Sequence, residues 1–214
     1  MTFSATPPTA RTDVQAVPPA QRRGMSPSTI RTLGAGLAVG AAASAVSAAF
    51  VGFKPDTEAG ILANDLSGLL FQAGLMGLLH VQMATRATGT KVINRRMLQL
   101  ERVLLSLAMA WTLCHALLPS QRDSTWLAVL DFAWPLSMLG MFLIGVKVAA
   151  VGRWRGPARA WALVAETWVV VTIPALGVLG EAGGTVVGAV HLVLGYSALG
   201  ILLATRPDLV GERG

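Results

Sequence analysis

Apolar residues fill six long stretches of the chain, and polar or helix-breaking residues separate one stretch from the next. The stretches cover residues 30–53, 60–84, 97–118, 125–149, 159–180 and 185–205. An α-helix of ~20 apolar residues crosses a bilayer core about 30 Å thick, and each stretch reaches that length. The pattern predicts an all-α protein, an integral membrane bundle of six transmembrane helices. Because the connections are short, we expect helices adjacent in sequence to pack as antiparallel neighbours.

The two ends of the chain have a different character. Residues 1–28 contain five prolines among Ser, Thr, Gln and Arg, without helical or strand periodicity, which predicts a disordered cytoplasmic tail. Residues 29–205 then form the transmembrane domain, and residues 206–214 a cytoplasmic C-terminal tail. Arg22 and Arg23 before an Ala-rich apolar stretch are also typical of a signal peptide. This stretch is longer than an ordinary signal-peptide core, so we interpret it as the first span.

The composition excludes the other broad classes of protein. Apolar residues make up 53% of the 214 residues, charged residues only 13%, and the mean hydropathy is +0.59. Soluble domains carry about 25% charged residues, so this chain is too poor in charge for an ordinary water-facing surface. A soluble globular protein, a disordered protein and a disulfide-rich scaffold are therefore excluded. The single cysteine, Cys114, lies inside an apolar stretch.

The basic residues predict the orientation of the helices. The net charge is +6 and the isoelectric point is near 10.7, which in a soluble protein would suggest a nucleic-acid partner. Here 15 of the 17 Lys and Arg residues share one side if the helices alternate, and Lys54 and Arg122 remain for the other. Cytoplasmic loops of membrane proteins collect Lys and Arg. We therefore expect a multi-pass protein of the cell membrane with both termini cytoplasmic, and no nucleic-acid partner.

Several ionisable residues lie well inside the apolar stretches. A charged group near the bilayer centre costs at least ~2.5 kcal/mol, so such residues usually face the interior of a bundle and mark function. Four of them fall at a similar depth in the outer half: Asp65, His115, Asp131 and His191. Helical spacing places Asp65 on one face with Gln72, and His115 on one face with Thr112 and Glu101. We expect a polar site beneath the outer surface.

Other ionisable residues lie toward the cytoplasmic side. Glu166 lies well inside the fifth stretch, whereas His80 and Glu101 lie near the inner boundary, where we expect water to solvate both side chains. His191 falls on a stripe of small residues at helical spacing that includes Gly188 and Gly195. Small residues let helices approach closely in lipid, so His191 is expected to face a neighbouring helix.

Tryptophan and proline positions indicate the walls of such a site. Trp111, Trp134 and Trp168 lie deep in their stretches, where aromatic faces can stabilise positive charge. Pro135, close to Asp131 in the same stretch, interrupts the backbone hydrogen bonding of its helix, and such kinks often line a cavity. The fourth stretch is therefore the first choice for a wall of the site.

The leading functional hypothesis is an acid–base enzyme, of cyclase or isomerase type, acting on a lipid-soluble, isoprenoid-like substrate. Such chemistry needs carboxyl groups that give and take protons. We expect Asp131 to be the acid and Asp65 or Glu166 the base. The substrate-binding candidates are Trp134, Trp168, Trp111, Gln72, His115 and His191.

Three other functions fit the same residues. His115 and His191 can form an axial pair for haem b or ligate another metal, although no HExxH or CxxC motif occurs and no dedicated metal centre is predicted. A weak internal repeat, in which the segment around Asp65 matches that around Asp131, suggests a carrier or a component of a proton-coupled permease. A non-catalytic partner subunit would use its polar groups only for helix packing. A homo-oligomer or a complex with another membrane protein is compatible with each of these.

Overall fold

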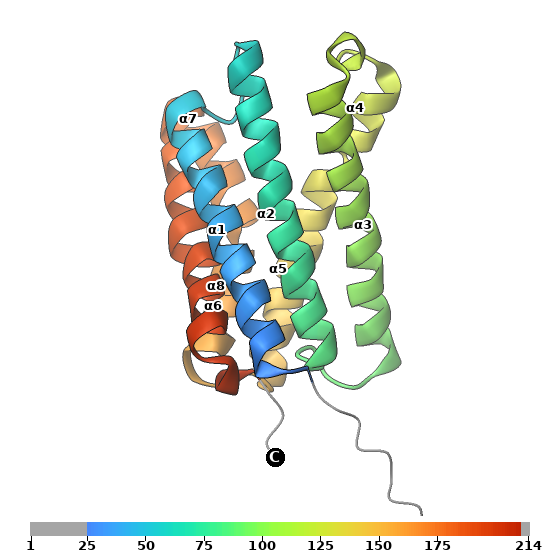
Figure 1. Cartoon of the computed structure of the whole chain (residues 1–214), viewed down its shortest axis with the longest axis vertical. Coiled ribbons are helices and arrows are strands. Elements are labelled where there is room, and N and C mark those ends of the chain that lie inside the picture. Colours follow the sequence, from blue (N-terminus) through green and yellow to red (C-terminus); the bar gives the residue numbers. More distant parts are fainter. Residues whose placement is uncertain (1–24, 211–214) are drawn as a thin grey trace, which may run out of the picture.

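The computed structural model describes residues 25–210, and every regular element in that range is a helix (Figure 1). Five helical segments are long and apolar enough to cross a membrane: 27–51, 58–84, 92–117, 125–151 and 156–205. The all-α class and the membrane-helical architecture expected from the sequence are confirmed.

Short connections join the helices. The first three are α1 (Pro27–Val51), α2 (Glu58–Ala84) and α3 (Val92–Leu117). A 3-10 turn, Pro119–Gln121, leads to α4 (Thr125–Asp131) and α5 (Ala133–Val151). The last segment contains α6 (Gly156–Glu166), α7 (Trp168–His191), a π-helical turn (Leu192–Ser197), α8 (Ala198–Thr205) and a 3-10 turn (Pro207–Leu209).

The segment 156–205 folds back on itself at Gly180. Gly180 has φ 71° and ψ −178°, a backbone conformation that glycine adopts at little cost. On either side of it the chain pairs in antiparallel fashion. Trp168 Nε1 donates to Gly188 O at 3.2 Å, and Trp161 Nε1 donates to Leu194 O at 2.8 Å. The fifth and sixth apolar stretches are therefore the two arms of one helical hairpin.

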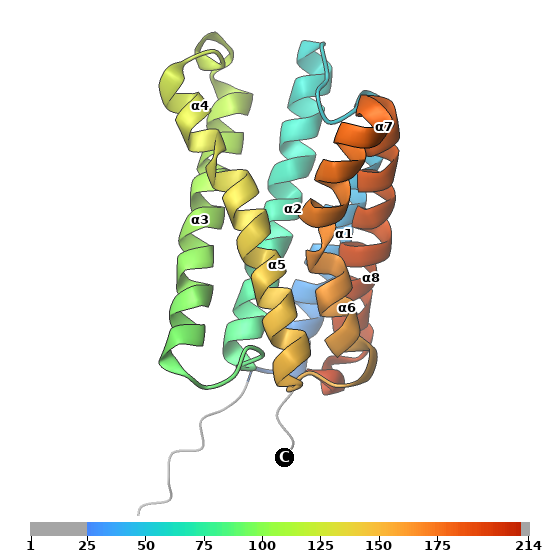
Figure 2. The same cartoon turned by 180° about the vertical axis from the view of Figure 1, so that it is seen from behind.

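The helices close into a ring in which neighbours in sequence are neighbours in space. α1 packs on α2, α2 on α3, α3 on α5 and α5 on α6, and the second arm of the terminal hairpin returns to α1 (Figures 1 and 2). The antiparallel neighbours predicted from the short connections are found.

Residues 25 and 210 lie at the same end of the bundle, which we call the terminal end (Figure 1). Lys54 and Arg122 lie near the opposite, distal end. The other Lys and Arg residues of the described range fall in the half toward the terminal end, on helix segments and on the turns 85–91 and 152–155. The uneven distribution of Lys and Arg along the sequence therefore places most of these residues in the described range toward one end of the bundle.

Large apolar side chains cover the outside of the bundle. Phe50 is 85% exposed and Val178 is 83% exposed, and every long helix carries further exposed Val, Leu or Ile side chains. Soluble monomers rarely expose contiguous apolar patches of more than a few hundred Å², whereas a lipid-facing surface requires them. The outer surface therefore agrees with a membrane protein.

Both predicted tails differ in part from the structure. α1 begins at Pro27, with Ser26 accepting from Thr29 N at 3.2 Å, because Ser is a good helix cap and Pro suits the first helical position. Residues 27 and 28 thus belong to the helix, while residues 1–24 lie outside the described range. At the other end, residues 206–210 pack back on the bundle: Val210 is buried, and Arg155 N donates to Leu209 O at 2.9 Å.

Substitution of a glycine on α1 tests the close approach of α1 and α8. A Cβ atom at Gly34 would lie 2.7 Å from Ala204 N and Gly200 O, whereas a Cβ atom at Gly36 meets nothing within 4 Å. Gly34→Ala should lower the free energy of unfolding by about 1–3 kcal/mol, the usual cost of overpacking. The matched change Gly36→Ala should cause no loss. Thermal unfolding in detergent measures both, and equal unfolding temperatures would contradict the packing.

Candidate functional site

A cavity of about 120 Å³ lies in the distal half of the bundle. Five of the residues predicted for a site line it, and they come from α2, α3, α5 and α7: Asp65, Gln72, Trp111, Trp134 and Trp168. Phe53, Phe71 and Leu192 add apolar surface. The ring of helices thus brings together polar and aromatic groups that lie as much as a hundred residues apart in the sequence.

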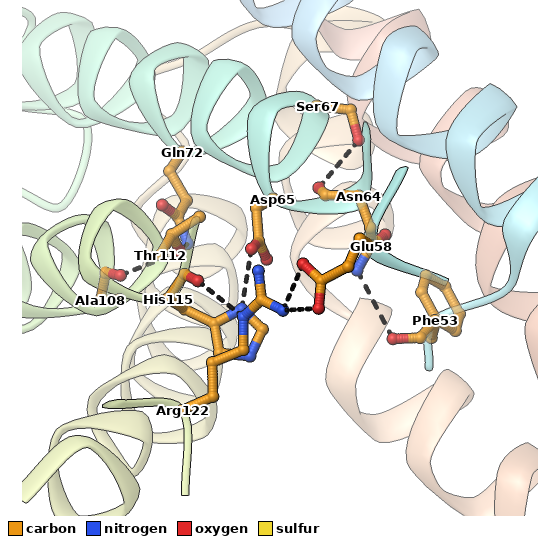
Figure 3. Close-up of polar contacts among 10 residues, drawn as sticks. All are labelled: Phe53, Glu58, Asn64, Asp65, Ser67, Gln72, Ala108, Thr112, His115 and Arg122. Carbon is orange, nitrogen blue, oxygen red and sulfur yellow. Dashed lines mark hydrogen bonds and ion pairs between the residues drawn. The ribbon is translucent and has the colours of Figure 1, made fainter. Parts of the chain in front are cut away.

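The main polar contact of this cavity joins Asp65 to His115. His115 Nδ1 lies 2.7 Å from Asp65 Oδ2, which links α2 to α3 (Figure 3). A carboxylate can only accept, so Nδ1 carries the proton when Asp65 is ionised. The Asp65 side chain is 5% exposed and that of His115 is 22% exposed. His115 therefore stands between the buried carboxyl group and the solvent-accessible surface of the bundle.

Aromatic rings form the rest of the wall. The Trp111 ring stacks on the His115 ring with centroids 4.8 Å apart. Trp134 meets Phe71 edge-on at 6.3 Å, and Trp168 meets Phe53 edge-on at 6.0 Å. The Trp168 indole nitrogen is also held by Gly188 O. These contacts fix the orientation of the rings, so the cavity has a preformed shape.

A second polar pair lies further along the same two helices. Gln72 Nε2 donates to Thr112 Oγ1 at 2.9 Å, and the Thr112 hydroxyl donates to Ala108 O at 3.1 Å (Figure 3). Gln72 Oε1 is buried and has no hydrogen-bond partner within residues 25–210. This amide oxygen is a free acceptor at the edge of the cavity.

Charged residues close the distal end above Asp65 and His115. Arg122 Nε donates to His115 O at 3.0 Å, and Arg122 NH1 lies 2.9 Å from Glu58 Oε1 (Figure 3). The arginine thereby ties the turn after α3 to the first turn of α2. The Arg122 side chain is 13% exposed, so it is largely packed against the distal ends of α2 and α3.

Asp131, the expected acid, is not part of this cavity wall. Its side chain is exposed, and within the described range it makes no side-chain hydrogen bond or ion pair. Pro135 has no N–H to donate to the Asp131 carbonyl, and the chain leaves helical hydrogen bonding at Phe132, between α4 and α5. The break separates Asp131 from Trp134, which does line the cavity.

His191 and His115 have different hydrogen-bond partners. The His191 Nε2 lies 3.1 Å from Thr167 Oγ1, on the other arm of the terminal hairpin, and its ring lies beside Gly195 of its own arm. Its Nδ1 has no partner in residues 25–210. No group of three or more His, Cys, Asp or Glu side chains in this range is arranged to hold a metal ion. The haem alternative for the two histidines stays a prediction.

The two glutamates form a separate polar cluster toward the terminal end. Gln82 Nε2 donates to Glu166 Oε1 at 2.6 Å, and Ser137 Oγ donates to Glu101 Oε1 at 2.5 Å. Glu166 Oε2 packs over Gly145, which follows Asp131 by a helical distance of about 20 Å at 1.5 Å per residue. Glu166 therefore bonds to Gln82, is not among the residues that line the cavity, and is not paired with Asp65 or Asp131.

Glu101 corrects one expectation. The sequence predicts a solvated Glu101 side chain, but it is 2% exposed, whereas His80 is exposed as predicted. The signal for burial was present in the sequence, because Glu101 shares a helical face with Ala108 and Thr112, and all three side chains are buried. Its neighbours Gln82, Ser137 and Tyr196, also buried, were missed because single polar residues in an apolar helix carry no pattern.

Comparisons with protein-family models, with curated proteins and with solved structures gave no match to this chain.

A double-mutant cycle tests the contact between Asp65 and His115. Asp65→Asn and His115→Phe, which keeps a ring for Trp111 to stack on, should each lower the free energy of unfolding by about 1–3 kcal/mol. The double variant should lose less than the sum, with a coupling of about 0.6–1.7 kcal/mol. Asp65→Asn combined with Arg206→Gln, at the terminal end, should be additive. Additivity in the first cycle would show that the contact contributes no stability.

Proposed function

We propose that the chain is a six-span protein of the cell membrane with both termini in the cytoplasm. Three observations support this. The described chain begins and ends at one end of the bundle (Figure 1). The segment 156–205 is long enough for two crossings and turns at Gly180. Most Lys and Arg residues lie toward the terminal end, and such residues mark the cytoplasmic side.

We further propose that the distal cavity binds the end of a lipid-soluble, isoprenoid-like molecule and that Asp65 exchanges protons with it. The observation that carries this proposal is a buried carboxyl group that lines an aromatic cavity and is bonded to a partly exposed imidazole at 2.7 Å. Ligand sites are typically mostly apolar, with a few polar groups that orient the ligand. This cavity has that composition.

The size of the cavity limits what it can enclose. Sites for drug-sized ligands measure about 300–1,000 Å³, whereas an apolar cavity of about 150 Å³ holds a single benzene ring. A volume of about 120 Å³ therefore suits one short branched unit of a longer chain. The remainder of the substrate would extend toward the bilayer, which fits a molecule delivered from lipid.

A single carboxyl group is sufficient for both proton transfers of a double-bond isomerisation. The Asp65 carboxyl gives its proton to one carbon of a double bond, and the bond electrons form the new C–H bond. The positive charge left on the other carbon faces the indole rings of Trp111, Trp134 and Trp168, which stabilise cations. A proton then leaves a neighbouring carbon for the carboxylate, so the double bond moves and the formula is unchanged. His115 is a positioning residue that links Asp65 to solvent protons.

A second candidate function, a proton-coupled carrier, is favoured by one observation. Glu101 and Glu166, both buried, lie in the other half of the bundle, so protonatable groups occur at two depths. Buried carboxyl groups in membrane bundles often belong to proton relays. A carrier would release its cargo chemically unchanged, whereas the enzyme would not.

Cysteine labelling tests the topology. In a Cys114→Ala background, Ser120→Cys and Ala182→Cys should react with a membrane-impermeant maleimide added outside intact cells, because both would lie in outer turns. Thr90→Cys should react only after the cells are opened. Protection of Ala182→Cys in intact cells would show that the terminal hairpin does not cross the membrane, and the six-span proposal would fail.

Deuterium incorporation tests the chemistry without knowledge of the substrate. Purified protein in liposomes is incubated in D₂O with the apolar lipid extract of the cells that produce it, and mass spectrometry finds lipids that gain deuterium. Wild type should produce such lipids, and Asp65→Asn should reduce their rate of formation at least about a hundredfold, the usual contribution of a general acid or base. Asp123→Asn, an exposed carboxylate near the distal end, is the matched control and should retain the rate.

Each alternative gives a different result in this assay. A carrier or a partner subunit would leave all lipids unlabelled with the wild-type protein, which would refute the enzyme proposal. Loss of labelling in Asp131→Asn but not in Asp65→Asn would assign the acid to Asp131, as the sequence first suggested.

A further inference from the structure

A basic groove of about 520 Å³ lies at the terminal end between α2 and α3, far from the aromatic cavity. Its cationic side chains are Arg86 from the α2–α3 turn and Arg95 and Arg102 from α3, and His80 from α2 also lines it. Arg95 and Arg102 are seven residues apart, so they project from one face of α3. The lining residues include no carboxylate.

The arginines of this groove have no anionic partner within residues 25–210. None of the ion pairs in that range involves Arg86, Arg95 or Arg102. Glu101, next to Arg102 in sequence, is buried, does not line the groove, and bonds to Ser137 of α5. Three guanidinium groups around one hollow repel one another, so an anion bound there would stabilise the arrangement.

The turn that presents Arg86 is rigidly held. Trp154 Nε1 donates to Thr85 Oγ1 at 3.0 Å, Asn94 Nδ2 donates to Thr88 O, and Ala87 N donates to Gln82 O at 2.9 Å. Arg86 has φ 50°, which is uncommon outside glycine and occurs at functional turns when the surroundings enforce it. The position of Arg86 is therefore preorganised.

Thr88 provides an independent indication of a ligand. It lines the groove and is 1% exposed, yet its hydroxyl oxygen has no hydrogen-bond partner in the described part of the chain. Buried hydroxyl groups are normally paired, because an unpaired one costs free energy. A hydroxyl donor beside guanidinium groups matches the oxygens of a phosphate group.

We propose that this groove binds the phosphate group of an anionic phospholipid. The groove also includes Met83, Ala84 and Leu98, so apolar surface for acyl chains continues from the cationic turn along α2 and α3. Basic pockets between membrane helices on the cytoplasmic side are known to take anionic headgroups. A free phosphate compound offers the same oxygens but has no acyl chain to pack on the apolar surface of the groove.

Lipid retention tests the proposal with the full chain. The protein is reconstituted in phosphatidylcholine containing a small fraction of cardiolipin, extracted in mild detergent, and analysed by native mass spectrometry. Wild type should retain cardiolipin, and Arg95→Gln with Arg102→Gln should lower retention at least about tenfold. Thr88→Val should lower it by a smaller factor. The matched control is Arg153→Gln with Arg159→Gln, which removes two bases at the same end outside the groove.

A second arm separates the two sources of phosphate. Wild type in nanodiscs of phosphatidylcholine alone is titrated with inorganic pyrophosphate, and the unfolding temperature is recorded. No stabilisation, together with groove-dependent retention of cardiolipin, supports a lipid ligand. Stabilisation that the double arginine variant abolishes would keep the phosphate site but reject the lipid as its source. Equal cardiolipin retention by groove and control variants, without pyrophosphate stabilisation, would overturn the proposal.

Discussion

A polar side chain inside a membrane bundle forms its hydrogen bonds with another helix or with a bound molecule, because lipid tails have no hydrogen-bonding groups. The interior of this protein follows that constraint. Asp65–His115 and Gln72–Thr112 join α2 to α3, Ser137–Glu101 joins α5 to α3, and Gln82–Glu166 joins α2 to α6. Each pair links two helices through side chains on the faces that point into the bundle.

The helices pack more closely on one side of the ring than on the other. Where α1 meets α2 and α8, glycines such as Gly40, Gly74 and Gly200 bring backbones so close that no Cβ would fit, and this side is filled. Where α2, α3 and α5 meet, larger and polar side chains keep the helices apart. The aromatic cavity reaches both sides, since Ser44 of α1 and Trp168 of α7 line it together with residues of α2, α3 and α5.

The two ends also differ in the chemistry they offer. The distal half combines a carboxyl–imidazole pair with indole faces, which suits an apolar group that develops charge. The terminal end combines guanidinium groups with a buried hydroxyl, which suits a permanent anion. In the glutamate cluster, the atoms Glu166 Oε2, Gln82 Oε1 and Tyr196 Oη are buried without partners in the described range. Buried water commonly satisfies such groups.

The sequence by itself determined the helical class, the approximate extents of the long helical segments and the polar stripes, because hydrophobic length and helical period are local properties. It also identified Asp65, Gln72 and the three tryptophans that line the cavity. Only the tertiary structure decided which of the four ionisable groups at similar depth meet. Asp65 pairs with His115, whereas the Asp131 side chain is exposed next to the break in helical hydrogen bonding at Phe132. Depth is encoded along the chain, but rotation about a helix axis depends on the neighbours that pack against it.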